Sequence, residues 1–187
     1  VRTGKSSNAR SSRPSRIRII SVRDTFSSKQ LLDYARSRGI SPATLGGCCS
    51  EVVFGYEGRG HFSGKTIGLR NNRGGWILRA PDTKKCTSSE ITTIDIYGTC
   101  SDVPTSRCGV LFEGMFDYLT FREIIGEPGC DACVLNSVNN IARAGGWIAS
   151  HDRLFTFMDD DEAGRTATLR IRRMASEREK CIEINDW

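Results

Sequence analysis

The sequence predicts an α/β protein in which a domain with a parallel sheet follows a smaller α+β subdomain with antiparallel strands. In the first half, strand-like segments are separated by glycine-containing hairpin signals such as Asn71–Gly75, which join antiparallel strands. In the second half, strand-like and helical segments alternate, which favours a parallel sheet with helices on its faces. A polar stretch with Pro104 separates the halves and is typical of a linker. We therefore expect a leader at 1–24, an α+β subdomain at 25–106 and a parallel-sheet domain at 107–187.

The leader is basic and serine-rich. Seven Lys or Arg residues and no acid precede Asp24, in a chain of 187 residues with a net charge of +5. The segment Ser6–Ala9 looks like a vector remnant, and we interpret residues 1–12 as a flexible tail. For residues 13–23 we leave a second interpretation open, an arm that follows a phosphate backbone.

Two short helices and four strands are expected in the subdomain. The first helix runs from Ser27 and stops at Gly39. The second has Ser41 as its N-cap and Pro42 at its first helical position. The strands are expected at Glu51–Tyr56, His61–Asn71, Gly75–Ala80 and Ile91–Tyr97.

The second half is expected to alternate between strand and helix. Strands are predicted at Cys108–Phe112, Ala132–Asn136, Leu154–Met158 and Cys181–Ile184. Helices are predicted at Gly114–Ile125, Val138–Ala144 and Glu162–Arg178. Right-handed crossovers place the carboxyl ends of parallel strands at one edge, where ligands bind in open sheets. Glu113 and Asp159–Asp161 end two of these strands, so we expect their carboxylates to meet at that edge.

The acids at this edge suggest a divalent metal site. Four consecutive acids repel one another by about 1 kcal/mol per pair at 4 Å in water, and a helix N-terminus or a bound cation relieves that repulsion. Asp117 follows Glu113 by one helical turn, and Asp159 and Asp161 would share one face of an extended strand. Carboxylate oxygens suit Mg²⁺ or Mn²⁺. The alternative for Asp160 and Glu162, which we prefer for these two, is that they serve the start of the helix.

The two acidic motifs resemble a known domain family. Glu113-Gly-Met-Phe-Asp117 and Asp159-Asp-Asp-Glu-Ala-Gly-Arg165 are similar to the signature motifs of the Toprim domain. They are most similar to the versions in bacterial DnaG-type primases and phage primase–helicases, which carry E-G-x-x-D and D-x-D-x-A-G-R. The resemblance extends from about Ser28 to Trp187, and the arrangement is similar to primases on mobile elements of gut-type bacteria. Those usually carry an upstream zinc-binding region, so we expect a fragment holding the catalytic core.

The resemblance implies a Toprim fold and assigns roles to individual residues. It implies that Glu113, Asp159 and Asp161 are catalytic and that Asp117 is an accessory acid, all four near the metal. It also implies basic residues that face the nucleotide and the template, for which the candidates are Arg70, Arg79, Lys84 and Lys85. Arg165 is a candidate phosphate contact, and Ala163-Gly164 should let the last helix pack closely. The stretch Leu135-Asn-Ser-Val-Asn lies where primases have a short turn that often contains glycine, and here it has none.

The leading functional hypothesis is the catalytic core of a DNA primase. Such an enzyme is a nucleotidyltransferase that makes RNA primers from NTPs on single-stranded DNA. Its expected protein partners are a replicative helicase or mobilisation proteins. A Toprim nuclease or a topoisomerase fragment would use the same acids. A non-catalytic nucleic-acid-binding module is the alternative from another class.

Composition limits the other possibilities. No apolar run is long enough to cross a bilayer and no signal-peptide pattern opens the chain, so we expect a cytoplasmic protein without a membrane partner. Among the eight cysteines only Cys130 and Cys133 form a C-x-x-C. A single such pair is weak evidence for metal, and we assign no zinc.

Overall fold

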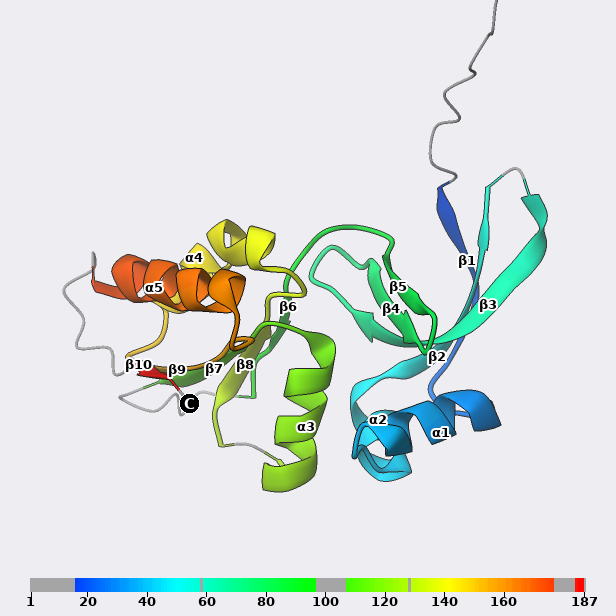
Figure 1. The fold of residues 1–187 in the computed structure, drawn as a ribbon, viewed down its shortest axis with the longest axis horizontal. Helices are drawn as coiled ribbons and strands as arrows, with labels where there is room; N and C mark the ends of the chain where they lie inside the picture. The colour runs from blue at the N-terminus through cyan, green and yellow to red at the C-terminus, as the bar shows by residue number, and fades with distance from the viewer. Residues whose placement is uncertain (1–15, 58, 97–106, 128, 177–183, 187) are drawn as a thin grey trace, which may run out of the picture.

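The residues that the structure describes form two five-stranded sheets (Figure 1). The computed structural model describes residues 16–57, 59–96, 107–127, 129–176 and 184–186. The first sheet, sheet A, is antiparallel with the order β1-β2-β3-β4-β5. Its strands are β1 (Ile17–Arg23), β2 (Ser50–Tyr56), β3 (Arg59–Arg70), β4 (Trp76–Ala80) and β5 (Thr83–Cys86). The helices α1 (Lys29–Ser37) and α2 (Pro42–Cys48) stand between β1 and β2 in the chain.

The second sheet, sheet B, is mostly parallel and has the order β10-β9-β7-β8-β6. Its strands are β6 (Thr92–Ile94), β7 (Cys108–Phe112), β8 (Asp131–Val134), β9 (Arg153–Phe157) and β10 (Ile184–Asp186). Its helices are α3 (Met115–Ile125), the 3₁₀ helix η1 (Val138–Ala144), α4 (Gly145–Ala149) and α5 (Glu162–Ser176). Figure 1 shows α3 on one side of this sheet and α4 and α5 on the other. The predicted fold class, an antiparallel α+β part followed by a parallel sheet, is confirmed.

Residues 17–23 are part of sheet A, so the prediction of a flexible leader through residue 24 is wrong for this segment. β1 pairs antiparallel with β2, and its residues alternate between half-buried and exposed as far as Val22. Ile17 and Ile19 pack against a small cluster on one face of the sheet. The period of two was present in the sequence, but the surrounding arginines and serines obscured it.

The segment predicted as a strand at Ile91–Tyr97 belongs to the other sheet. Thr92–Ile94 pairs antiparallel with β8 at the edge of sheet B, not with the hairpins of the first half. Ile91 is buried in the core of the second half together with Leu111 and Leu135. Because this burial is favourable, the segment pairs with sheet B and not with sheet A. The boundary at 106/107 stays a prediction, although sheet B includes residues that precede it.

One hydrophobic core joins the two halves. Its buried residues come from α1, α2 and sheet A on one side, and from α3, β7 and β8 on the other. They include Leu31, Leu45, Ile67, Ile77, Phe112, Met115 and Leu119. A second core lies on the opposite face of sheet B, beneath η1, α4 and α5. Because apolar burial is the main favourable term in folding, the shared core fixes α1 against α3.

A buried carboxylate holds the amino ends of the strands of sheet B. Asp131 is fully buried and accepts hydrogen bonds from the Ile96 N–H at 2.8 Å, from His151 at 3.1 Å and from the Arg107 guanidinium. Burial alone would raise the pKa of Asp131, but these hydrogen bonds outweigh it and hold the pKa below its usual value. This cluster lies at the opposite edge of the sheet from Glu113 and serves the fold.

Candidate active site

Two of the predicted acids follow neighbouring strands of sheet B. Glu113 follows β7 and Asp159 follows β9 by one intervening residue, and Phe112 and Phe157 are partners in the parallel ladder. The Glu113 N–H donates to the carbonyl of Phe157 at 3.0 Å. The Asp159 N–H in turn donates to Oε2 of Glu113 at 3.2 Å. The fold therefore brings together carboxylates that lie 46 positions apart in the chain.

Asp117 completes the acidic corner from the first turn of α3. One of its oxygens, Oδ2, accepts a hydrogen bond from the Gly114 N–H at 2.8 Å and so caps the helix. Its side chain is half-buried and lines the same cleft as Glu113 and Asp159. We refer to Glu113, Asp117 and Asp159 as the acidic corner.

Burial and neighbouring carboxylates both disfavour ionisation in the acidic corner. Burial raises the pKa of Glu113, the hydrogen bond from Asp159 opposes this rise, and the charges of Asp159, Asp161 and Asp117 add to it. Burial also raises the pKa of Asp117, against the hydrogen bond from Gly114, and the charge of Asp159 adds to this rise. A cation bound between these groups would favour their ionised forms.

The loop between β9 and α5 divides the remaining acids differently from our prediction. β9 ends at Phe157, so Asp159 and Asp161 lie in a loop and not on one face of a strand. Asp161 is the residue that caps α5, since its Oδ1 accepts from the Gly164 N–H at 2.8 Å and its carbonyl from the Arg165 N–H at 3.0 Å. Asp160, which we predicted to serve the helix start together with Glu162, pairs with Arg165 in the first turn of α5 at 2.8 Å, whereas the cap comes from Asp161. Asp161 lines an adjoining hollow between η1 and α5.

The donor set of the acidic corner fits a hard divalent cation that is shared with a ligand. Among the described residues, no three Asp, Glu, His or Cys side chains are grouped so that they alone could hold a metal ion. The assignment of Glu113, Asp117, Asp159 and Asp161 to one metal site stays a prediction. Mg²⁺ is commonly held by one or two carboxylates, with water and substrate phosphates as its other ligands. The carboxylates of the acidic corner suit that mode.

A cleft of about 580 Å³ opens between the acidic corner and sheet A. Its other walls come from α1, from the β4–β5 hairpin and from the loop after β8. Arg79 and Lys84, both predicted as basic contacts, line it. The Arg79 guanidinium is fixed there, because it donates to the carbonyls of Leu78 and Lys85.

The other basic candidates lie elsewhere. Arg70 lies over the Trp76 ring, 5.4 Å from its centroid, and Lys85 over the Tyr56 ring at 5.8 Å. Side chains alternate between the two faces of a strand, so Lys85 and Lys84 project from opposite faces of β5. Arg165 is exposed and lines a separate hollow beside α5, next to Asp160.

The structure also adds residues to the cleft that the sequence did not single out. Tyr34 of α1 and Arg38, the C-cap residue of that helix, line it. So does Asn136, in the turn without glycine. Asn136 has a φ of +62°, a left-handed conformation that asparagine tolerates better than other non-glycine residues. That tolerance was the signal in the sequence that an asparagine could take the place of glycine here.

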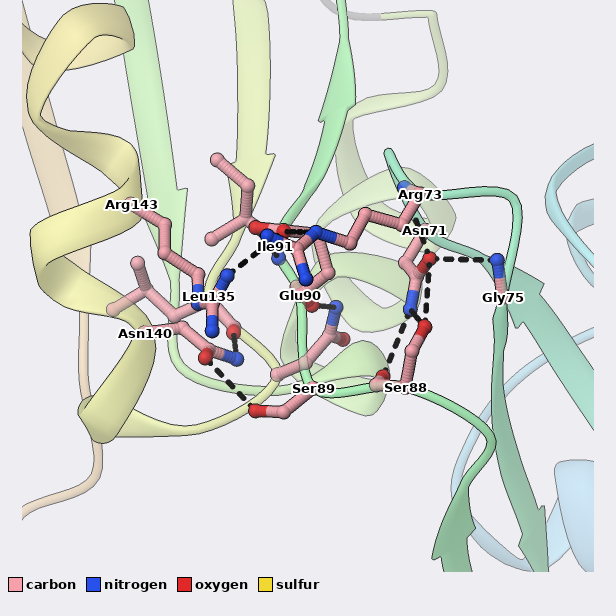
Figure 2. Close-up of polar contacts among 11 residues, drawn as sticks. Asn71, Arg73, Gly75, Ser88, Ser89, Glu90, Ile91, Leu135, Asn140 and Arg143 are labelled. Atoms are coloured by element: carbon pink, nitrogen blue, oxygen red, sulfur yellow. Dashed lines mark hydrogen bonds and ion pairs between the residues drawn. The ribbon is translucent and has the colours of Figure 1, made fainter. Parts of the chain in front are cut away.

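A polar cluster around Glu90 fixes the Asn136 turn (Figure 2). The Glu90 carboxylate pairs with Arg73 at 2.8 Å, from the β3–β4 turn, and with Arg143 at 3.1 Å, from η1. The Glu90 carbonyl and the Thr92 hydroxyl accept from the Asn136 amide at 3.0 and 3.1 Å. The cluster thus connects a turn of sheet A to one wall of the cleft.

Comparisons with known proteins agree with this architecture. Residues 110–187 match the model of the Toprim-like family, and residues 19–88 match that of a domain of unknown function (DUF8464). The fold is similar to the crystal structure of the primase fragment of the bacteriophage T7 primase-helicase protein, with a TM-score of 0.51 and 17% sequence identity. That match covers 81% of this chain and 64% of the T7 chain. No curated protein matches the chain.

The Toprim-like match covers both acidic motifs. The Toprim-like model includes Glu113, Asp117, Asp159 and Asp161 within its range, and the T7 likeness, at this identity, concerns the fold. No helix among the described residues is long and apolar enough to cross a membrane. The chain thus carries a Toprim-like domain at residues 110–187, within a fold similar to that of a primase fragment.

Proposed function

We propose that this chain is the catalytic part of a metal-dependent primase, which joins ribonucleotides on a single-stranded DNA template. The observation that carries the proposal is the composition of the cleft. Its acidic corner lies in one cavity with three cations, Arg38, Arg79 and Lys84. A nucleoside triphosphate with its divalent cation is a ligand that matches both charges.

The acids would hold Mg²⁺ or Mn²⁺. Glu113 and Asp159 are the principal ligands in this proposal, with Asp117 and Asp161 as accessory acids. When bound, the ion supplies positive charge against the phosphate oxygens on which negative charge develops during phosphoryl transfer. The hydrogen bond from the Asp159 N–H to Glu113 keeps the two acid-bearing loops together.

The basic residues would hold phosphates. Arg79 is held in place by two backbone carbonyls, which pre-orients its guanidinium toward the cleft, whereas Lys84 is exposed and contributes a mobile charge. Arg70 and Lys85 would contact a template only outside the cleft, and Arg165 only beside α5. Template binding of this kind weakens steeply with salt. A helicase partner is a further proposal, suggested by the likeness of the fold to a fragment of a primase-helicase protein.

Primer synthesis by matched variants tests the proposal. The assay follows labelled NTP incorporation on single-stranded DNA with Mg²⁺. Glu113→Gln and Asp159→Asn remove one charge each from the acidic corner with little change of shape, and we expect each to lower synthesis by at least about 100-fold. Asp160→Asn is the control, because Asp160 is exposed and pairs with Arg165 outside the cleft. Its activity should stay close to that of the wild type.

Other outcomes would favour the other functions. Cleavage of the DNA in the absence of NTP would contradict the primase proposal and assign the acids to a nuclease. Salt-sensitive DNA binding without synthesis or cleavage, unchanged in Glu113→Gln, would indicate a non-catalytic binding module. Primer synthesis that survives both acid substitutions would refute the proposed site.

A further inference from the structure

One wall of the cleft is aromatic. Tyr34 and Arg38 are four residues apart, so they lie on one face at the end of α1, and both contact the ring of Phe116 from α3. The Tyr34 and Phe116 rings pack edge to face, with centroids 5.3 Å apart and planes at 76°. The Arg38 guanidinium lies over the Phe116 ring, 4.9 Å from its centroid. We call Tyr34, Arg38 and Phe116 the aromatic wall.

Tyr34 is the ring of this wall that a ligand can reach. Phe116 is 9% exposed, whereas Tyr34 is half-buried and lines the cleft. No described residue makes a hydrogen bond with the Tyr34 hydroxyl, although the backbone carbonyl of Tyr34 accepts one from Ser37. Buried tyrosine hydroxyls usually find a partner, so the open hydroxyl agrees with a side chain that faces the cavity.

The aromatic wall adjoins the acidic corner. Phe116 and Asp117 are consecutive in α3, and both line the cleft. Arg38 is near enough for its charge to act on the Asp117 carboxyl. A single bound molecule can therefore touch the wall and the acids together.

A nucleotide has the two kinds of surface that this cavity matches. Its phosphates are anionic, and its base is a flat ring that stacks on aromatic side chains and guanidinium planes. We propose that Tyr34, with Arg38 beside it, forms a subsite that stacks a nucleobase whose phosphates reach the acidic corner. This subsite rests on the proposed function, because it takes the acidic corner as the phosphate end of the ligand. The base belongs either to a nucleoside triphosphate or to a DNA strand.

The test must separate stacking from packing, since Tyr34 also packs against the shared core. Loss of a merely structural ring would weaken every ligand alike. The informative quantity is therefore the affinity for a ligand with a base divided by the affinity for the same ligand without one. We would measure this base preference by calorimetry with Mg²⁺ in two arms. The first arm compares ATP with inorganic triphosphate, and the second compares a single-stranded oligonucleotide with its abasic analogue.

We expect the wild type to prefer the ligand that carries a base by about 5- to 150-fold in at least one arm, because stacking contributes about 1–3 kcal/mol per base. Tyr34→Ala should abolish that preference, and Tyr34→Phe should keep it. Tyr34→Leu keeps apolar volume without a ring, and it replaces Tyr34→Ala if the alanine variant does not fold. Tyr56→Ala is the matched control, because Tyr56 lies under Lys85, outside the cleft, and it should keep the preference.

A wild type without base preference in both arms, or a preference that survives loss of the Tyr34 ring, would refute the subsite. Failure of the proposed function gives a different result. In that case neither ATP nor triphosphate would bind to the wild type with Mg²⁺, or both would bind to Glu113→Gln as tightly as to the wild type. The arm that shows the preference identifies the source of the base.

Discussion

Replacing Gly164 by alanine should displace the loop that carries Asp159. Gly164 is buried at the start of α5, and a Cβ built on it would lie 1.9 Å from the carbonyl oxygen of Asp159. Ordinary contact begins at 3.4 Å, so the loop or the helix must move by roughly 1.5 Å, which is the difference between these two distances. Because the obstructing atoms belong to the backbone, no side-chain rotation can relieve the contact. The close approach is that of Gly164 to the loop after β9, whereas Ala163 is exposed, so the prediction that Ala163-Gly164 lets the helix pack close to the strand stays a prediction.

The cost can be worked out from this geometry. Overpacking of this kind costs about 1–3 kcal/mol, and a backbone obstacle favours the upper end. Alanine regains about 1 kcal/mol over glycine in a helix, which leaves a net loss of about 2 kcal/mol. For a chain of this size that corresponds to a melting temperature lower by about 4–8 °C. The shift also strains the hydrogen bond from the Asp159 N–H to Glu113, and misplacement by about 1 Å can cost about 100-fold in rate.

Thermal unfolding and primer synthesis would be measured side by side. The control is Gly146→Ala in α4, where a Cβ meets nothing within 4 Å. That change should stabilise the protein by about 0.4–1 kcal/mol and leave synthesis unchanged. If Gly164→Ala melts at or above the wild-type temperature, the steric reasoning is wrong, whatever the activity shows.

Two further predictions concern buried charges. Asp131→Asn leaves Arg107 without its anionic partner and should destabilise the protein by about 3–5 kcal/mol at pH 7, measured by urea unfolding. The pKa of Asp131 lies below its usual value in the folded state. The contribution of Asp131 to the free energy of unfolding is therefore present above the unfolded pKa of about 3.9 and is lost as the pH falls through the folded pKa. A stability difference between the wild type and Asp131→Asn that does not shrink in acid would contradict this. Glu90→Gln removes the charge that both arginines contact, and because those arginines are largely exposed we expect a loss of only about 1 kcal/mol. That loss should decrease with added salt, and an equal loss at low and high salt would exclude an electrostatic origin.

Whether a helix or strand was predicted correctly depends on how far along the chain its sequence signals extend. Periodicity and capping act within a few residues, so they located α1, β7 and α3 within one or two residues of their observed bounds, and they located the start of α2 at Pro42. The same signals cannot say which sheet a strand joins. The partner of Thr92–Ile94 was decided by the burial of neighbouring Ile91 in the core under η1, α4 and α5. β1 was missed because its apolar residues stand in an arginine-rich context.

The predictions for the candidate site also separate into those that follow from local rules and those that depend on contacts between distant segments. The sequence by itself determined that Glu113 and Asp159 follow strands of one parallel sheet, because strand ends and crossover handedness are local or general rules. Only the tertiary structure decided that Lys84 and not Lys85 lines the cleft, and that Tyr34 and Arg38 form its aromatic wall with Phe116. Each of these depends on which face of an element meets another element. That choice is made by the shared core that packs α1 against α3, and no single stretch of the sequence contains it.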